Sequence, residues 1–146
     1  DKDALDQEFG QLAQEVQRIF TGTTFNGKAV VGADAGAQTY QIGAGTAAAD
    51  SLTITTTNMT TAATITAVAG TDLAGAGRAV IDNTADSTAL GTVIDDIDAA
   101  LATVNTERAT YGAVQNRFDA VIKNLSTSME ASTASRSGGT CPSSSR

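Results

Sequence analysis

Apolar residues recur at alternating steps of four and three along the second half of the chain. This spacing places them in one stripe on a helix, so it predicts a long helix over 87–134. The stripe consists of Leu90, Ile94, Ile97, Leu101, Val104, Tyr111, Phe118, Ile122, Leu125 and Met129. Arg108 and Gln115 also occupy stripe positions, where polar groups are costly unless they are paired. We interpret these two residues as register-setting contacts or as points where the helix meets another molecule.

The predicted length of this helix is large for a chain of this size. As a helix, Ser87 to Met129 would be roughly 64 Å long. A compact globule of 146 residues has a radius of gyration of only about 15 Å. We therefore expect a rod-like molecule or assembly. Either Ser87 or Thr92 begins the helix, the latter through a capping box with Asp95.

A second apolar stripe with the same spacing lies near the start of the chain. It consists of Leu5, Phe9, Leu12, Val16 and Ile19. The stripe predicts a helix over 3–20 that Asp3 caps and that ends before Gly22, a residue able to take a left-handed conformation. This helix covers about four turns, while the long stripe runs about eleven. Therefore the β segment, another helix or a neighbouring subunit must cover the rest of the long stripe.

The segment between the two stripes has the composition of a small β region over 28–68. Tyr40 and Ile42 alternate with polar or small residues, and so do Leu52 and Ile54. Such alternation is typical of half-buried strands, so we expect an antiparallel hairpin. Before the hairpin, Asn26-Gly27 is a strong turn dipeptide.

Two shorter segments complete the predicted architecture. We expect a third strand over Ala63–Val68, and a variable loop over 69–86 with a short helical turn at 78–81. The fold class is then α+β, with one short and one long helix in a rod-like bundle or hairpin beside a small antiparallel β-hairpin region. Residues 1–137 form this core domain, and the Ser/Gly-rich residues 138–146 form an added, disordered tail.

Composition and charge exclude several classes of function. Nine basic and sixteen acidic residues give a net charge of −7 without a basic cluster, so nucleic acid and anionic membranes are not expected partners. The absence of histidine excludes serine–histidine and cysteine–histidine catalysis and the histidine-dependent zinc motifs. Cys141 is the single cysteine, so no intramolecular disulfide forms. No converging carboxylates or lysines are visible, and we expect neither an enzyme nor a cofactor.

Two patterns resemble ligand-binding sites, a glycine-rich segment and a cluster of aspartates, but their context does not support binding. Gly43-x-Gly45-x-x-Ala48 resembles a dinucleotide fingerprint, but the fingerprint needs a helix next and a β-branched segment follows, so a turn is favoured. Asp95, Asp96 and Asp98 would hold a hard cation only if they converged, and adjacent helical residues point in different directions. We interpret these aspartates as complementing the dipole at the N-terminus of the long helix.

The remaining motifs closely resemble those of bacterial flagellins. Residues 14–19, Gln-Glu-Val-Gln-Arg-Ile, followed by Thr-Thr-Phe-Asn-Gly-Lys at 23–28, are similar to the N-terminal signature of the family. Tyr-Gln-Ile-Gly-Ala at 40–44 is similar to its hairpin strand. The run Ile97 to Asn105, with Arg108 and then Gly-Ala-Val-Gln-Asn-Arg-Phe at 112–118, resembles its C-terminal signature.

This resemblance implies the core domain of a structural subunit of the extracellular, secreted flagellar filament, in which Arg108, Gln115, Asn116 and Arg117 are candidates for packing against other flagellin subunits. The terminal helices that form the inner tube of the filament are not recognisable in the sequence. We therefore expect a fragment that does not polymerise alone.

The resemblance also implies a second partner. Many flagellins are bound by a vertebrate Toll-like receptor, and Glu8 matches the acidic receptor contact of the family by position. Two alternatives remain: a hook–filament junction protein, which fits the helices but not the signatures, and a flagellin-like surface module that binds polysaccharide through its Thr-rich β segment.

Overall fold

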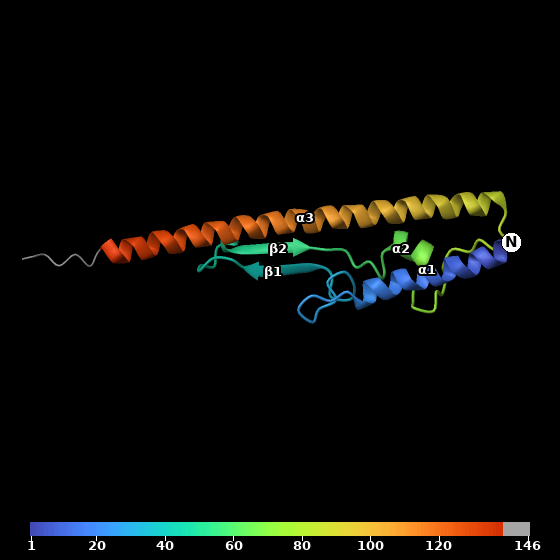
Figure 1. The fold of residues 1–146 in the computed structure, drawn as a ribbon, viewed down its shortest axis with the longest axis horizontal. Coiled ribbons are helices and arrows are strands. Elements are labelled where there is room, and N and C mark those ends of the chain that lie inside the picture. Colours follow the sequence, from blue (N-terminus) through green and yellow to red (C-terminus); the bar gives the residue numbers. More distant parts are fainter. Residues whose placement is uncertain (139–146) are drawn as a thin grey trace, which may run out of the picture. The chain divides into compact units, whose positions relative to one another are not determined.

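The computed structural model describes residues 1–138 of the chain (Figure 1). Its elements are α1 (Lys2–Gly22), β1 (Ala37–Gln41), a 3-10 turn (Ala48–Asp50), β2 (Ser51–Thr55), α2 (Ala63–Ala69) and α3 (Ser87–Gly138). These elements confirm the α+β class. The chain divides into two compact units between Thr110 and Tyr111, within α3. The predicted tail, with Cys141, falls almost wholly outside the described residues.

Both ends of α1 differ from the prediction. Asp1 rather than Asp3 is the N-cap residue, and Asp3 lies in the first turn. Gly22 is the last helical residue, and it is not among the glycines with positive φ. Instead Thr23 ends the helix, since both its backbone N–H and its hydroxyl donate to the carbonyl of Ile19. A left-handed glycine is unnecessary when a hydroxyl satisfies the carbonyl.

The predicted hairpin forms, but only β2 shows the expected half-buried alternation, since Tyr40 of β1 is 40% exposed and Ile42 follows the end of β1. β1 and β2 pair antiparallel, with Tyr40 opposite Leu52 and Thr39 opposite Thr53. Leu52 and Ile54 point into the protein and are buried, while the alternate residues are exposed or half-buried. Asn26-Gly27 also forms the predicted turn, because both residues have positive φ and the flanking residues form a β-bridge.

The predicted third strand is wrong, because Ala63–Ala69 forms the short helix α2. Ile65 and Ala69, four residues apart, are both buried and join a small core with Ala13 and Met59. A strand would place residues 65 and 69 on one face as well, so the apolar pattern does not separate the two structures. The buried contacts with α1 decide for the helix.

The segment predicted as a variable loop forms a connecting segment, residues 70–86, that follows the polar side of α1. No helical turn forms at 78–81. Side chains of α1 bind it throughout, in the pairs Gln17–Gly70, Gln14–Ala74, Asp6–Arg78, Asp6–Ile81, Asp3–Asn83 and Lys2–Ala85. The contact of the Gln17 amide with the carbonyl of Gly70 is buried and 2.5 Å long. The connecting segment is therefore part of the folded unit.

The long helix α3 begins at Ser87, the first of the two predicted starts. The carboxylate of Asp86 accepts the backbone N–H of Ala89 at 2.7 Å, which is an N-terminal capping contact. No acidic residue lies in the first turn. The dipole interpretation of Asp95, Asp96 and Asp98 is thus wrong, since the effect fades within one turn and these residues lie further along the helix.

Candidate functional site

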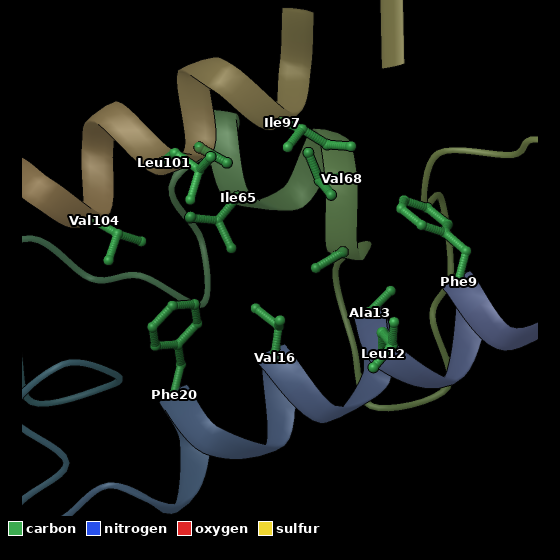
Figure 2. Close-up of a pocket in the computed structure, with 12 residues that line it drawn as sticks. Phe9, Leu12, Ala13, Val16, Phe20, Ile65, Val68, Ile97, Leu101 and Val104 are labelled. Atoms are coloured by element: carbon green, nitrogen blue, oxygen red, sulfur yellow. The ribbon is translucent and has the colours of Figure 1, made fainter. Parts of the chain in front are cut away.

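An apolar groove runs between α1, α2 and the first part of α3 (Figure 2). It encloses about 320 Å³. Its lining is apolar throughout: Phe9, Leu12, Ala13, Val16 and Phe20 from α1, Ile65, Val68 and Ala69 from α2, and Ile97, Ala100, Leu101 and Val104 from α3. All twelve residues belong to the first compact unit. We call this hollow the groove.

The floor and the edges of the groove differ in exposure. Ala13, Ile65 and Ala69 form a buried floor, each 4% exposed or less. At the edges, Leu12 is 60% exposed and Leu101 is 56% exposed. Apolar side chains gathered around an open hollow are unusual on a protein that acts alone, because contiguous apolar surface favours association. The groove therefore has the character of a packing surface.

An ion pair between Arg78 and Asp6 lies beside Phe9, one of the residues that line the groove. Arg78 of the connecting segment lies 6.0 Å from the ring of Phe9, and its guanidinium donates two hydrogen bonds to Asp6, at 2.9 and 2.5 Å. Asp6 also accepts the backbone N–H of Ile81 at 2.8 Å. The Arg78 hydrogen bonds and that N–H hold the pKa of Asp6 at about 2. Gly10 makes room, since a Cβ there would lie 3.0 Å from the guanidinium.

A buried carboxylate that the sequence analysis missed lies on α3. Glu107 is 8% exposed, and its Oε1 accepts the backbone N–H of Thr57 at 2.8 Å. Its Oε2 is buried and has no hydrogen-bond partner among the residues that the structure describes. Glu107 fixes the chain after β2 to α3. Glu107 lies one residue before Arg108, a polar position of the stripe, and this position gives only a weak signal, because charged residues beside a stripe are usually solvated.

The glycine pattern at Gly43 and Gly45 forms a closed turn. The backbone N–H groups of Ile42 and Gly43 donate to the carbonyl of Asp50, and the side chain of Gln41 donates to the carbonyls of both glycines. The Asp50 carboxylate fills the space beside the glycines, where an added Cβ would collide with it. A carboxylate in this place repels a phosphate, so the turn interpretation is favoured by the electrostatics.

The predicted site residues lie on exposed parts of the helices. Glu8 is exposed on α1, next to the groove residue Phe9. Arg108, Gln115, Asn116 and Arg117 are exposed on α3, with Arg108 in the first unit and the other three in the second. None of these five residues lines the groove. The five residues predicted from the sequence motifs are therefore exposed positions outside the groove. The lining of the groove consists largely of residues from the apolar stripes of α1 and α3.

A membrane-spanning helix and a metal site are two other features to consider in residues 1–138. No helix in that range is long and apolar enough to cross a membrane. No group of three or more acidic side chains in the same residues lies close enough together to hold a metal ion.

Comparison with known proteins decides the family. Residues 94–138 match the family described as the bacterial flagellin C-terminal helical region. The chain is 37% identical to YvzB of Bacillus subtilis (strain 168), which is provisionally named a flagellin. The 128 aligned residues make up 86% of this chain and 71% of YvzB. The chain belongs to the flagellin family.

A second relative has the same family name. The flagellin of Halalkalibacterium halodurans (strain C-125) is 32% identical over 130 residues, which are 89% of this chain and 43% of that flagellin. No solved structure matches the chain. Flagellins are structural proteins of the flagellar filament. The family match includes Arg108, Gln115, Asn116 and Arg117, but not Glu8.

Proposed function

We propose that the chain is the core part of a structural subunit of the bacterial flagellar filament, exported from the cell and assembled with other flagellin subunits. Residues 1–137 are the core domain of this subunit. The observation that carries the proposal is the apolar groove in a chain of the flagellin family, because a subunit of a polymer needs packing surface that a solitary protein does not. Exposed Arg108, Gln115, Asn116 and Arg117 would pack against neighbouring subunits.

The uncovered groove also supports the proposal that these 146 residues do not polymerise alone. Large apolar side chains at its edges, such as Leu12 and Leu101, remain more than half exposed. In the complete subunit another helix would cover them, so that the core becomes rigid enough to stack. We therefore expect the chain by itself to give no filaments, even when filament seeds are added.

A chimaeric flagellin tests both statements. Residues 1–138 replace the matching region of the Halalkalibacterium flagellin, and filaments are then sought by electron microscopy. We expect filaments from the chimaera and none from the chain alone. A chimaera with Leu101→Asp should fold but assemble poorly, because the charge enters the groove. A matched variant, Thr106→Asp, changes an exposed residue outside the groove lining and should assemble normally. A folded chimaera that fails even under seeding contradicts the proposal.

The exposed position of Glu8 supports a further proposal, recognition by a vertebrate Toll-like receptor. A carboxylate on an open helix face is accessible to a basic receptor side chain. Glu8→Ala should weaken receptor binding about tenfold in surface plasmon resonance, a typical loss for one interfacial ion pair. Gln11→Ala, one turn further along α1 and also exposed, is the control. Equal binding of both variants and the parent would exclude Glu8 as a contact.

The two alternative functions have less support. The signatures and the family match favour a flagellin over a hook–filament junction protein. For polysaccharide binding, the relevant feature is the exposed threonine face of the hairpin. There Thr39 and Thr53 bind each other through their hydroxyls at 3.0 Å, which leaves fewer free groups for a sugar.

A further inference from the structure

One side of the first part of α3 contains an unexpected buried charge. Val93, Ala100 and Glu107 are spaced by seven residues, about two turns, so they lie along one side of the helix. Val93 and Glu107, at 9% and 8% exposed, are the most buried side chains of α3 within residues 87–137. Charged residues are seldom this buried without a partner, so Glu107 occupies a position where an apolar side chain is expected.

Thr103 and Glu107, one turn apart on α3, both bind the segment that follows β2. Oε1 of Glu107 accepts the backbone N–H of Thr57 at 2.8 Å. The hydroxyls of Thr103 and of Thr64, in the first turn of α2, are 2.8 Å apart. Thr103 donates its single hydroxyl proton to the carbonyl of Ala99, so Thr64 is the donor in this pair. All of these residues lie in the first compact unit, and we call Thr103 and Glu107 the polar pair.

The segment that the polar pair binds is itself well anchored. The backbone N–H of Met59 donates to the carbonyl of Val31 at 2.9 Å, and the hydroxyl of Thr56 accepts the backbone N–H of Gly36 at 3.2 Å. These two hydrogen bonds do not involve α3. Met59 is also only 2% exposed, within the small core of the unit. The segment therefore forms a fixed support, against which the polar pair sets α3.

The polar pair adjoins the residues of α3 that line the groove. Ile97, Leu101 and Val104 point from α3 into the groove (Figure 2). Because a helix is stiff, contacts at Thr103 and Glu107 also fix the direction in which these side chains point. We propose that the polar pair consists of positioning residues, which hold α3 in the one rotation and register in which the groove accepts another helix of the complete flagellin subunit. This inference rests on the proposed function, since it assumes that the groove is a packing surface.

Apolar contacts alone specify the position of α3 poorly. The hydrophobic effect has no direction, and a rotation of α3 by one residue, about 100°, changes which side chains enter the groove. A hydrogen bond to one N–H has a narrow range of distance and angle. Glu107 also carries a cost, since its Oε2 is buried and has no hydrogen-bond partner among residues 1–138. Exchanging such a group for an apolar one is often neutral or stabilising, so stability alone does not account for Glu107.

Distance measurements in the chain itself test the position of α3. Spin labels are attached to Gln11→Cys on α1 and Ala102→Cys on α3, both exposed in the first unit, in a Cys141→Ser background. The double variant Thr103→Val with Glu107→Leu removes both polar contacts with little change in volume. Its label–label distance should shift by about 2 Å or become distinctly broader, within the usual range of spacings of packed helices. Its melting temperature should stay equal or rise.

Conservative variants separate positioning from a general structural role. Glu107→Gln keeps a carbonyl that accepts the N–H of Thr57, and Thr103→Ser keeps the hydroxyl, so both should restore the parent distances. Thr92→Val removes an exposed hydroxyl of α3 outside the polar pair and is the matched control. Each single variant is also measured, so that unfolding of the double variant does not remove the test. Parent-like distances in every folded variant overturn the proposal, and so do equal shifts in the apolar and the conservative variants.

The chimaeric flagellin tests the effect of the polar pair on assembly. Glu107→Leu should raise the protein concentration needed for filament growth about three- to tenfold, the usual effect of one hydrogen bond, and Glu107→Gln should leave it unchanged. Equal assembly of both variants overturns the inference. If the parent chimaera itself gives no filaments, the proposed function is contradicted, while the label distances still decide whether the polar pair positions α3.

Discussion

Ile65→Ala is expected to lower the free energy of unfolding by about 2–5 kcal/mol, the usual cost of removing a buried branched side chain and leaving a cavity. Ile65 is 2% exposed and packs with Ala13, Met59 and Ala69. Because the core of this unit is small, other side chains cannot easily fill the space. Urea denaturation followed by far-ultraviolet circular dichroism measures the effect.

The control for this substitution is Leu73→Ala, in the connecting segment. Leu73 is 54% exposed, so truncating it removes little buried surface and should shift the midpoint only slightly. Equal midpoints for Ile65→Ala and the parent chain would show that α2 does not contribute to the core. Because Ile65 forms part of the floor of the groove, Ile65→Ala should also weaken the binding of any helix that packs into the groove.

The sequence predicted the elements whose signal extends over many residues. The stripes of α1 and α3 repeat through several turns, and only a helix keeps such a repeat on one face. The hairpin was predictable because β1 and β2 alternate and glycine and alanine connect them. In contrast, α2 contains seven residues, and Ile65, Thr66 and Val68 all favour a strand locally. Contacts with α1, distant in sequence, override this preference.

Long-range polar contacts were beyond prediction for a related reason. The connecting segment looks like a loop because its residues are small and polar. It is ordered because Asp3, Asp6 and Gln17 of α1 bind it from positions more than fifty residues away. Glu107 is similar, since its partner Thr57 lies fifty residues earlier in the chain. One sequence shows which groups can form hydrogen bonds, but not which groups meet.

The stripe on α3 shows what periodicity does and does not establish. It correctly placed the apolar side chains on one face, and it indicated that α1 is too short to cover them. It did not separate the partly buried positions of the stripe, such as Val104, from the exposed ones, such as Leu101, because both kinds recur every seven residues. Arg108 and Gln115 are among the exposed positions, so their polarity costs little within one chain.

Asp6→Ala is expected to destabilise the chain by about 2–3 kcal/mol at neutral pH, somewhat less than the loss of a fully buried ion pair. The substitution leaves Arg78 without its partner and removes the acceptor for the backbone N–H of Ile81. The side chains of Arg78 and Asp6 are only 19% and 13% exposed, so water restores little of the lost interaction. Thermal and urea denaturation measure the loss. Glu15→Ala, which breaks the exposed ion pair with Arg18, is the control and should cause no measurable change.

The same ion pair predicts a specific dependence of stability on pH. The pKa of Asp6 lies at about 2 in the folded protein and near its ordinary value of 3.8 in the unfolded chain, so the unfolded state binds the proton more readily. The stabilisation is therefore complete above about pH 5 and declines as the pH falls through 3.8 toward 2. The Thr84 hydroxyl also lowers the pKa of Asp82, so the parent chain loses stability in acid for more than one reason. The difference between the parent chain and Asp6→Ala isolates Asp6: it should be constant from about pH 5 to 7 and shrink between about pH 4 and 2. A difference that stays constant down to about pH 2 would mean that the Asp6 carboxylate does not hold the connecting segment on α1.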